Sequence, residues 1–254
     1  MCYNIIMKWI FLSPHLDDVV YSCGGFIWDL TNAGQDVEVW TICGADPPPG
    51  SLSPFATSLH SDWGLAENAY QIRRAEDQSA LGILGAKSRY LPFLDCIYRQ
   101  SSGGQFFYDS EQAIFGGLDV SESGLIDDLT ADLESDIHGD YRVVAPLGIG
   151  NHVDHELTRK AANRLSRSAS YYADYPYAWE SEGVETLNFM ENSPEWNNEL
   201  FQITENSLEK WFLAARTYQS QISTFWEDEN ELRTEIREFS NSLEGIKLWE
   251  AIEN

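Results

Sequence analysis

Short apolar runs alternate with longer amphipathic segments over the first two thirds of the chain. The runs with the length and apolarity of buried strands lie at 5–12, 36–43, 88–92, 142–146 and 169–173. The segments with helical periodicity lie between and after them, at 18–33, 65–85, 123–138 and 154–167. Strands that alternate with helices indicate βαβ units. We therefore predict an α/β, Rossmann-like fold with a mostly parallel β-sheet flanked by helices.

The pattern changes in the last quarter of the chain. From about residue 206 it becomes all-helical, and an apolar stripe that includes Leu208, Trp211 and Tyr218 should dock on the sheet. We expect one domain over 1–254, with an α/β core of about 1–175 and a mainly helical C-terminal extension of about 176–254. Two long segments, 44–64 and 93–122, interrupt the alternation. Loops of this length in a compact domain usually bind or cover a ligand.

The negative charge of the chain makes some classes of binding partner unfavourable. Its 41 acidic and 16 basic residues give a formal net charge of −25, which disfavours nucleic acid and anionic lipid surfaces as partners. The apolar runs are too short to span a bilayer, and the N-terminal segment does not resemble a signal peptide. Four scattered cysteines without C-x-x-C spacing are typical of buried thiols. We expect a cytoplasmic protein without stable membrane association.

Candidate metal ligands follow two of the predicted strands. His15-Leu16-Asp17-Asp18 comes directly after the first strand, and His152-Val153-Asp154-His155 follows the strand at 142–146. Open α/β sheets bind ligands outside the carboxyl ends of their strands. A catalytic zinc takes three nitrogen, oxygen or sulfur ligands and leaves a position for water, and Fe²⁺ or Co²⁺ also suits such a set. One of the adjacent aspartates can ligate together with His15, which leaves the other free to act on the water.

These residues also carry a family resemblance. Ser13 to Asp18, followed by Cys23-Gly24-Gly25, resembles the H-x-D-D signature of the LmbE-like, PIG-L-type zinc de-N-acetylases. His152 to His155 resembles their second motif, H-x-D-H. The likeness covers most of the chain and continues at Arg73–Asp77, Leu94-Asp95, Tyr98-Arg99, Asp174–Tyr177 and Tyr218–Gln221. Leu16 stands where many members have a proline, a change that should not disturb ligation.

The resemblance implies a role for each motif residue. It implies that the zinc ligands are His15, Asp18 and His155. It further implies that Asp17 is the general base and later the acid, that His152 stabilises the oxyanion, and that Asp154 orients or polarises His152. In addition, Gly24 and Gly25 would let the backbone pass close to the metal loop.

Several further residues have both a functional and a structural interpretation. Arg73 is expected to bind substrate, or to form a surface pair with Glu76. Asp95 is expected to accept sugar hydroxyls, or to cap a loop. Side chains that could wall the pocket or stack on a sugar ring are His60, Trp63, Tyr175 and Tyr177; Trp9, Trp40 and Trp211 are expected in the core.

We therefore expect a zinc-dependent hydrolase that removes an N-acetyl or other N-acyl group from a glucosamine-type sugar or its conjugate. Metal-activated water would be the nucleophile and Asp17 the base. An alternative substrate is a thiol-sugar conjugate or an N-acylated glycosylated natural product. An alternative of another class is a non-catalytic, metal-containing sugar-binding protein. A nucleotide-binding protein is disfavoured because no G-x-G-x-x-G follows the first strand. A homo-oligomer is compatible with the sequence.

Overall fold

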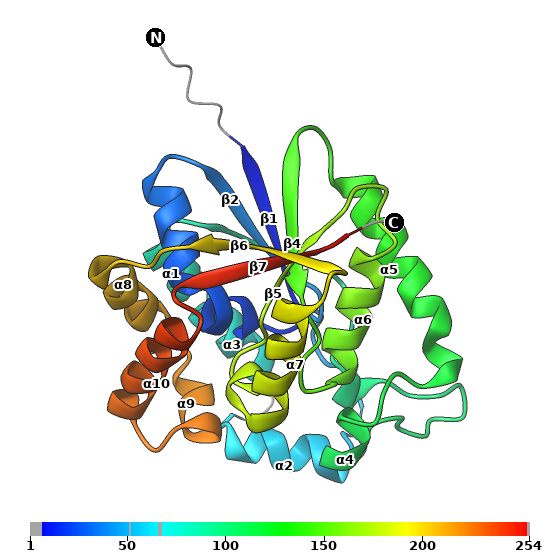
Figure 1. Cartoon of the computed structure of the whole chain (residues 1–254). Helices are drawn as coiled ribbons and strands as arrows, with labels where there is room; N and C mark the ends of the chain where they lie inside the picture. The colour runs from blue at the N-terminus through cyan, green and yellow to red at the C-terminus, as the bar shows by residue number, and fades with distance from the viewer. Residues whose placement is uncertain (1–6, 51, 66–67, 253–254) are drawn as a thin grey trace.

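The chain forms one twisted sheet with helices on both faces (Figure 1). The computed structural model describes residues 7–50, 52–65 and 68–252. Its sheet has the strand order β3-β2-β1-β4-β5-β7-β6. The strands are β1 (Lys8–Ser13), β2 (Asp36–Thr41), β3 (Lys87–Tyr90), β4 (Tyr141–Pro146), β5 (Ser170–Tyr172), β6 (Trp196–Phe201) and β7 (Ile246–Ala251). The first five are parallel, and β7 runs antiparallel to both β5 and β6. The predicted α/β class is confirmed.

The parallel half matches the predicted alternation of strands and helices. On one side lie α1 (Asp18–Asn32) and α3 (Ala69–Leu84), and on the other α5 (Ser123–Asp136) and α6 (Val153–Ala162). The central strands β1 and β4 are almost wholly apolar where helices cover both faces, as expected for parallel strands. The predicted core tryptophans Trp9, Trp40 and Trp211 are all buried.

Some predicted boundaries differ from the observed ones. The first predicted strand includes residues 5–6, which lie outside the described residues, as does Cys2; Cys23, Cys43 and Cys96 are buried free thiols. The helix predicted at 65–85 is described from Ala69, and the one at 154–167 ends at Ala162. The two long loops contain short helices: α2 (Pro54–Asp62) in the first, and η1 (Cys96–Tyr98), α4 (Glu111–Ile114) and η2 (Val120–Glu122) in the second.

The C-terminal extension is mainly helical but also completes the sheet. Its helices are η3 (Tyr177–Trp179), α7 (Ser181–Asn192), α8 (Glu205–Ala215), α9 (Gln219–Phe225) and α10 (Glu229–Ser242). The prediction that everything after 206 is helical is wrong at the end, because β7 inserts between β5 and β6. Five of the six residues of β6 are polar or aromatic, and most are exposed, so this edge strand lacks an apolar signal. Within the described chain, no helix combines the length and apolarity needed to cross a bilayer.

The paired glycines of α1 serve helix packing. A Cβ on Gly24 would meet Trp211 of α8 at 2.5 Å, and one on Gly25 would meet the same ring at 3.0 Å. The Trp211 indole donates to the carbonyl of Val20 in α1 at 2.7 Å. The glycines therefore make room for α8 on the flank of α1, which differs from the predicted close approach to the metal loop.

Candidate active site

The two histidine motifs meet at the carboxyl ends of β1 and β4. His15 lies in the loop after β1, and Asp18 is the first residue of α1. His15 Nδ1 is 3.1 Å from Asp18 Oδ2, and its Nε2 is 3.0 Å from Asp154 Oδ2. The backbone N–H of His15 also donates to Asp18 Oδ2 at 2.7 Å. The strand-end loop and the first turn of α1 are thus held together around one imidazole.

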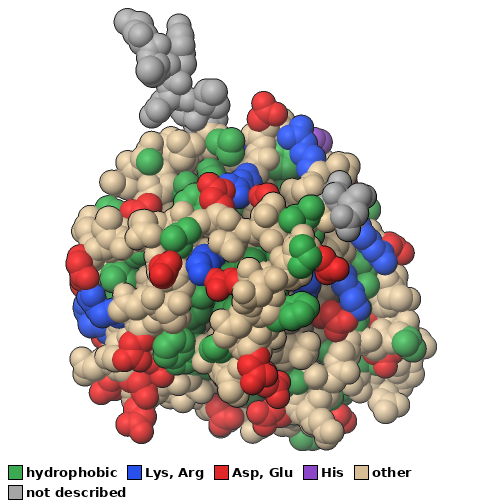
Figure 2. Space-filling view, viewed as in Figure 1, with side chains coloured by type: hydrophobic (Ala, Val, Ile, Leu, Met, Phe, Trp, Pro, Cys, Tyr) green, Lys and Arg blue, Asp and Glu red, His purple; other side chains and the backbone are tan. Residues whose placement is uncertain are grey.

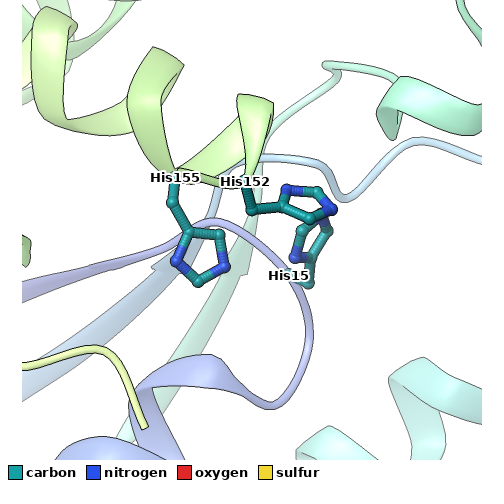
Figure 3. A group of neighbouring side chains, drawn as sticks. All are labelled: His15, His152 and His155. Carbon is teal, nitrogen blue, oxygen red and sulfur yellow. The ribbon is translucent and has the colours of Figure 1, made fainter. Parts of the chain in front are cut away.

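His155 approaches the same carboxylate from α6. Its Nδ1 is 2.7 Å from Asp174 Oδ1, and its Nε2 is 3.3 Å from Asp18 Oδ1. Nε2 is buried and makes no hydrogen bond. Figure 3 shows the rings of His15, His152 and His155 gathered beside the start of α6. An imidazole held by a carboxylate on one nitrogen, with the other nitrogen left open, is the arrangement that metal-binding histidines adopt.

The surrounding charge favours a bound cation. Buried carboxylates outnumber buried guanidiniums around the histidines: Asp17, Asp18, Asp95, Asp154 and Asp174 against Arg73 and Arg99. Burial lowers the pKa of His155, but the charges of Asp18 and Asp174 outweigh it and raise that pKa to about 9. Burial also opposes ionisation of Asp18, yet His155 and His15 hold its pKa well below the usual value. A site that draws protons onto its imidazoles in this way would also stabilise a divalent metal.

The three predicted ligands, His15, Asp18 and His155, lie in contact with one another and remain candidates for a metal site. The donors are two imidazoles and a carboxylate, which suit zinc, and His155 Nε2, which makes no hydrogen bond, lies 3.3 Å from Asp18 Oδ1. A second grouping is also close, because ring nitrogens of His15, His152 and His155 lie within 4.8 Å of one another. The two sets share His15 and His155 and differ in the third ligand.

His152 is held as a neutral hydrogen-bond donor. It is the N-cap of α6, and its Nδ1 accepts the backbone N–H of Asp154 at 3.2 Å. Burial, reinforced by the neighbouring His15, lowers the pKa of His152 to about 3. A neutral ring that accepts at Nδ1 carries its proton on Nε2. The helix cap thus fixes the tautomer that can donate to a developing oxyanion.

Asp17 is buried beside a guanidinium. Its Oδ2 is 3.4 Å from Arg73 Nη2. Burial raises the pKa of Asp17 to about 6, although the charge of Arg73 opposes the rise. A carboxylate with a pKa near neutrality can take a proton and return it within one reaction cycle.

The family comparison agrees with this geometry. The family model described as "PIG-L: GlcNAc-PI de-N-acetylase" matches residues 10–166. The chain belongs to the PIG-L family of de-N-acetylases. Its relatives include 2'-N-acetylparomamine deacetylases of Niallia circulans, 33% identical over 66% of each chain, and of Streptomyces fradiae, 27% identical over 69% of this chain and 60% of that protein. The crystal structure of the zinc-inhibited form of teicoplanin deacetylase Orf2 superposes with a TM-score of 0.81 at 28% identity, covering 98% of this chain and 99% of that one.

In this PIG-L chain the two predicted substrate residues are buried, Arg73 beside Asp17 and Asp95 beside His15. Arg73 is 4% exposed and stacks on Trp63, with 4.7 Å from its guanidinium carbon to the ring centroid. The surface pair of Arg73 with Glu76 is wrong, because Glu76 accepts instead from the Ser220 backbone and hydroxyl. Asp95 caps η1 by accepting from Ile97 N, and it also accepts from Tyr70. It lies 3.9 Å from His15 Nε2, so its capping role and its place at the site coexist.

A cavity of about 910 Å³ opens beside this cluster. It is lined by Asp46–Gly50 from the first long loop, by His60 and Ser61 of α2, and by Tyr70 and Gln71 of α3. Tyr70 lies between this cavity and the histidine cluster: its hydroxyl donates at 2.6 Å to Asp95, which is 3.9 Å from His15 Nε2. His60 lines the cavity and stacks on Trp63, which does not line it. Tyr177 packs against His155, whereas Tyr175 is 1% exposed in the core and donates to Glu235, so stacking of Tyr175 on a sugar is wrong.

Sequence reasoning assigned no role to two residues that the structure places here. Asp174 follows β5 and holds His155. Arg99 forms a buried ion pair with Asp154. Both lie in segments that carry the family resemblance, but only the folded chain shows which side chains they contact. Asp154 likewise directs its carboxylate to His15, Cys96 N and Arg99, whereas its link to His152 is through the backbone.

Proposed function

We propose that this protein is a metal-dependent N-deacetylase that hydrolyses the acetamide of an amino-sugar conjugate. One observation carries the proposal. The open Nε2 of His155 faces Asp18, with a base of near-neutral pKa, Asp17, and a neutral donor, His152, in the same buried cluster. Zinc is the proposed metal, with Fe²⁺ or Co²⁺ as the other ions that suit these donors.

The proposed ligands are His15, Asp18 and His155, and each protein group then has a distinct task. Zinc bound there would act as a Lewis acid and lower the pKa of water to about 7. Asp17 takes the proton of the attacking water, and His152 donates its Nε2 proton as a hydrogen bond to the carbonyl oxygen as charge develops there. Asp17 then returns the proton to the departing amine, because an amine leaves more readily than an amide anion.

Asp154 takes a modified role in this proposal. We propose that it supports His15 by hydrogen bonding, with its Oδ2 3.0 Å from Nε2. Asp174 supports His155 in the same way. Such carboxylates fix the orientation of metal-binding imidazoles and raise their basicity. Asp154 also contributes to His152 through the helix cap, since its backbone N–H fixes the ring tautomer.

The cavity suggests how the sugar conjugate is held. Its volume of about 910 Å³ suits a molecule larger than a single sugar. Arg73 and Asp95 are the proposed polar contacts to the sugar; neither lines the cavity, but Arg73 lies against Tyr70, which does, and Asp95 accepts from the Tyr70 hydroxyl. The relatives that act on 2'-N-acetylparomamine or teicoplanin favour a glycosylated natural product as the substrate class. We propose a small-molecule partner, since the net charge of −25 disfavours anionic polymers.

The two adjacent aspartates provide the test. Asp18→Asn should lose most of the zinc measured by elemental analysis, whereas Asp17→Asn should keep about one zinc per chain. Both should lose amine release from a panel of N-acetyl amino-sugar conjugates. For Asp17→Asn the expected loss is about 10²–10⁴-fold, the usual contribution of a general base.

Two outcomes would contradict this assignment. If Asp17→Asn strips the metal while Asp18→Asn retains it, the roles of the two aspartates are exchanged. If the zinc-loaded wild-type protein binds the conjugates and releases no amine, the non-catalytic sugar-binding alternative replaces the hydrolase. His152→Ala distinguishes the two ligand sets, because it should spare zinc binding only when Asp18 is the third ligand.

A further inference from the structure

A network of buried charged side chains connects the second long loop with the proposed metal centre. Arg99 is 5% exposed, and its Nη1 donates to Asp154 Oδ1 and, at 3.2 Å, to the carbonyl of Leu94. Its Nε is 2.9 Å from Glu122 Oε1. Glu122 in turn accepts from the Tyr108 hydroxyl at 2.7 Å. The guanidinium thus lies between two buried carboxylates, and only one of them contacts a proposed metal ligand.

Tyr108 and Glu122, the residues of this network farthest from the metal centre, are themselves held in place. The Arg99 guanidinium lies over the Tyr108 ring, 5.1 Å from its centroid. The Tyr108 hydroxyl accepts from the backbone N–H of Asp119 at 2.8 Å while it donates to Glu122. Hydrogen bonds to ionised groups in a buried setting fix geometry strongly. Arg99 therefore has little freedom to move away from Asp154.

The Asp154 carboxylate could either hydrogen-bond to His15 or bind a metal ion itself. Its Oδ2 accepts from Cys96 N at 3.0 Å and bonds His15 Nε2. Yet donor atoms of Cys96, His152 and Asp154 lie within 4.8 Å of one another, as do those of His15, Cys43 and Asp154. These sulfur, nitrogen and oxygen sets also suit zinc. The guanidinium on Asp154 opposes a dication there, because the like charges repel in a poorly solvated site.

We propose that Arg99 is a positioning residue that keeps Asp154 as the hydrogen-bonding partner of His15 and out of the metal's coordination sphere. The inference rests on the metal centre of the proposed function. It assigns to the second long loop a role in metal selection: Arg99 directs the ion to the side of the site formed by His15, Asp18 and His155, and away from the thiols of Cys43 and Cys96.

The test compares Arg99→Met, which removes the charge, with Arg99→Lys, which keeps it. Arg142→Met is the matched control, because Arg142 also joins two carboxylates, Glu199 and Glu250, at the opposite end of β4. Each protein is loaded with Co²⁺ and titrated with Zn²⁺. The readouts are the metal stoichiometry, the affinity measured by chelator competition, and the thiolate-to-cobalt charge-transfer absorption.

Arg99→Met is expected to bind metal about 10–100-fold more weakly at the first site, the range seen when support of a metal ligand is lost. It should also bind a second equivalent or gain the thiolate band. Arg99→Lys should restore most of the affinity, and Arg142→Met should match wild type. Wild-type affinity with no thiolate band in a folded Arg99→Met protein would overturn the proposal.

If Arg99→Met does not fold, Glu122→Gln replaces it, since this variant removes one charge and keeps the shape. A smaller loss of affinity in the same direction is expected, and unchanged affinity would overturn the proposal. Failure of the proposed function would be seen in a different result: the wild-type protein itself would bind no metal or release no amine.

Discussion

Alanine in place of glycine should have opposite effects on stability at two helical positions. Gly24 lies in α1 against Trp211, and a Cβ there would be 2.5 Å from Trp211 Cδ1. Gly82 lies in α3, and nothing stands within 4 Å of a Cβ built on it. Both are replaced by the same residue in a helix, so the intrinsic gain from alanine, about 1 kcal/mol, is shared. Packing alone decides the difference.

The magnitude at Gly24 follows from how firmly Trp211 is held. The indole is wholly buried and donates to Val20 O at 2.7 Å. Overpacking of a filled core costs about 1–3 kcal/mol, and displacement of the ring also endangers a hydrogen bond worth about 0.5–1.5 kcal/mol. After the gain from alanine is subtracted, we expect Gly24→Ala to destabilise by about 1–3 kcal/mol. Gly82→Ala should stabilise by about 0.5–1 kcal/mol.

Thermal unfolding of the metal-loaded proteins measures the change in stability of both variants. For a chain of this size, 1 kcal/mol moves Tm by about 2–4 °C. Gly24→Ala should lower Tm by several degrees, and Gly82→Ala should raise it slightly. An equal rise in both variants would refute the reasoning, because it would mean that α1 and α8 can separate to accept a methyl group without cost.

The remaining predictions concern the site and its surroundings. Asp174→Asn should weaken zinc binding about 10–100-fold, measured by chelator competition, because the amide supports the His155 imidazole less well than a carboxylate; unchanged affinity would contradict this role. Burial raises the pKa of Asp77 to about 7, so the fold holds this proton more tightly than the unfolded chain does. The contribution of Asp77 to stability should therefore be lost as pH rises from about 4 to 7, and Asp77→Asn should gain more over wild type at pH 8 than at pH 5 in thermal unfolding. Ser61→Trp should fill part of the cavity and raise KM for large conjugates while zinc content stays constant; equal KM values would place the sugar elsewhere.

The parallel half of the fold could be predicted because its signals are local. Apolar runs such as 142–146 mark strands that are buried on both faces, and the ligand motifs stand directly at their carboxyl ends. The edge strand β6 could not be predicted in this way, because its residues are mostly exposed. The final strand β7 was hidden by the helical pattern before it, since six residues are too few to show a change of period.

The residue types of the site could be predicted from the sequence, but the contacts between its side chains could not. His15, Asp18 and His155 come together as expected, because sheet topology brings the ends of β1 and β4 side by side. The connection between Asp154 and Arg99 could not be read from the sequence, because 55 residues separate the two. Burial likewise turned Arg73 from a candidate surface residue into a neighbour of Asp17.

The position of β7 bears on how the protein can be divided. β7 fills the gap between β5 and β6, so removing it would open two strand edges at once, one on the catalytic half of the sheet and one on the extension. Exposed edges are templates for intermolecular pairing. The boundary near residue 175 therefore separates regions of different pattern but not units that could be produced apart. A cut there would leave β5, the strand that precedes Asp174, unpaired on one side, so the strand that positions the partner of a proposed metal ligand would become an exposed edge prone to aggregation.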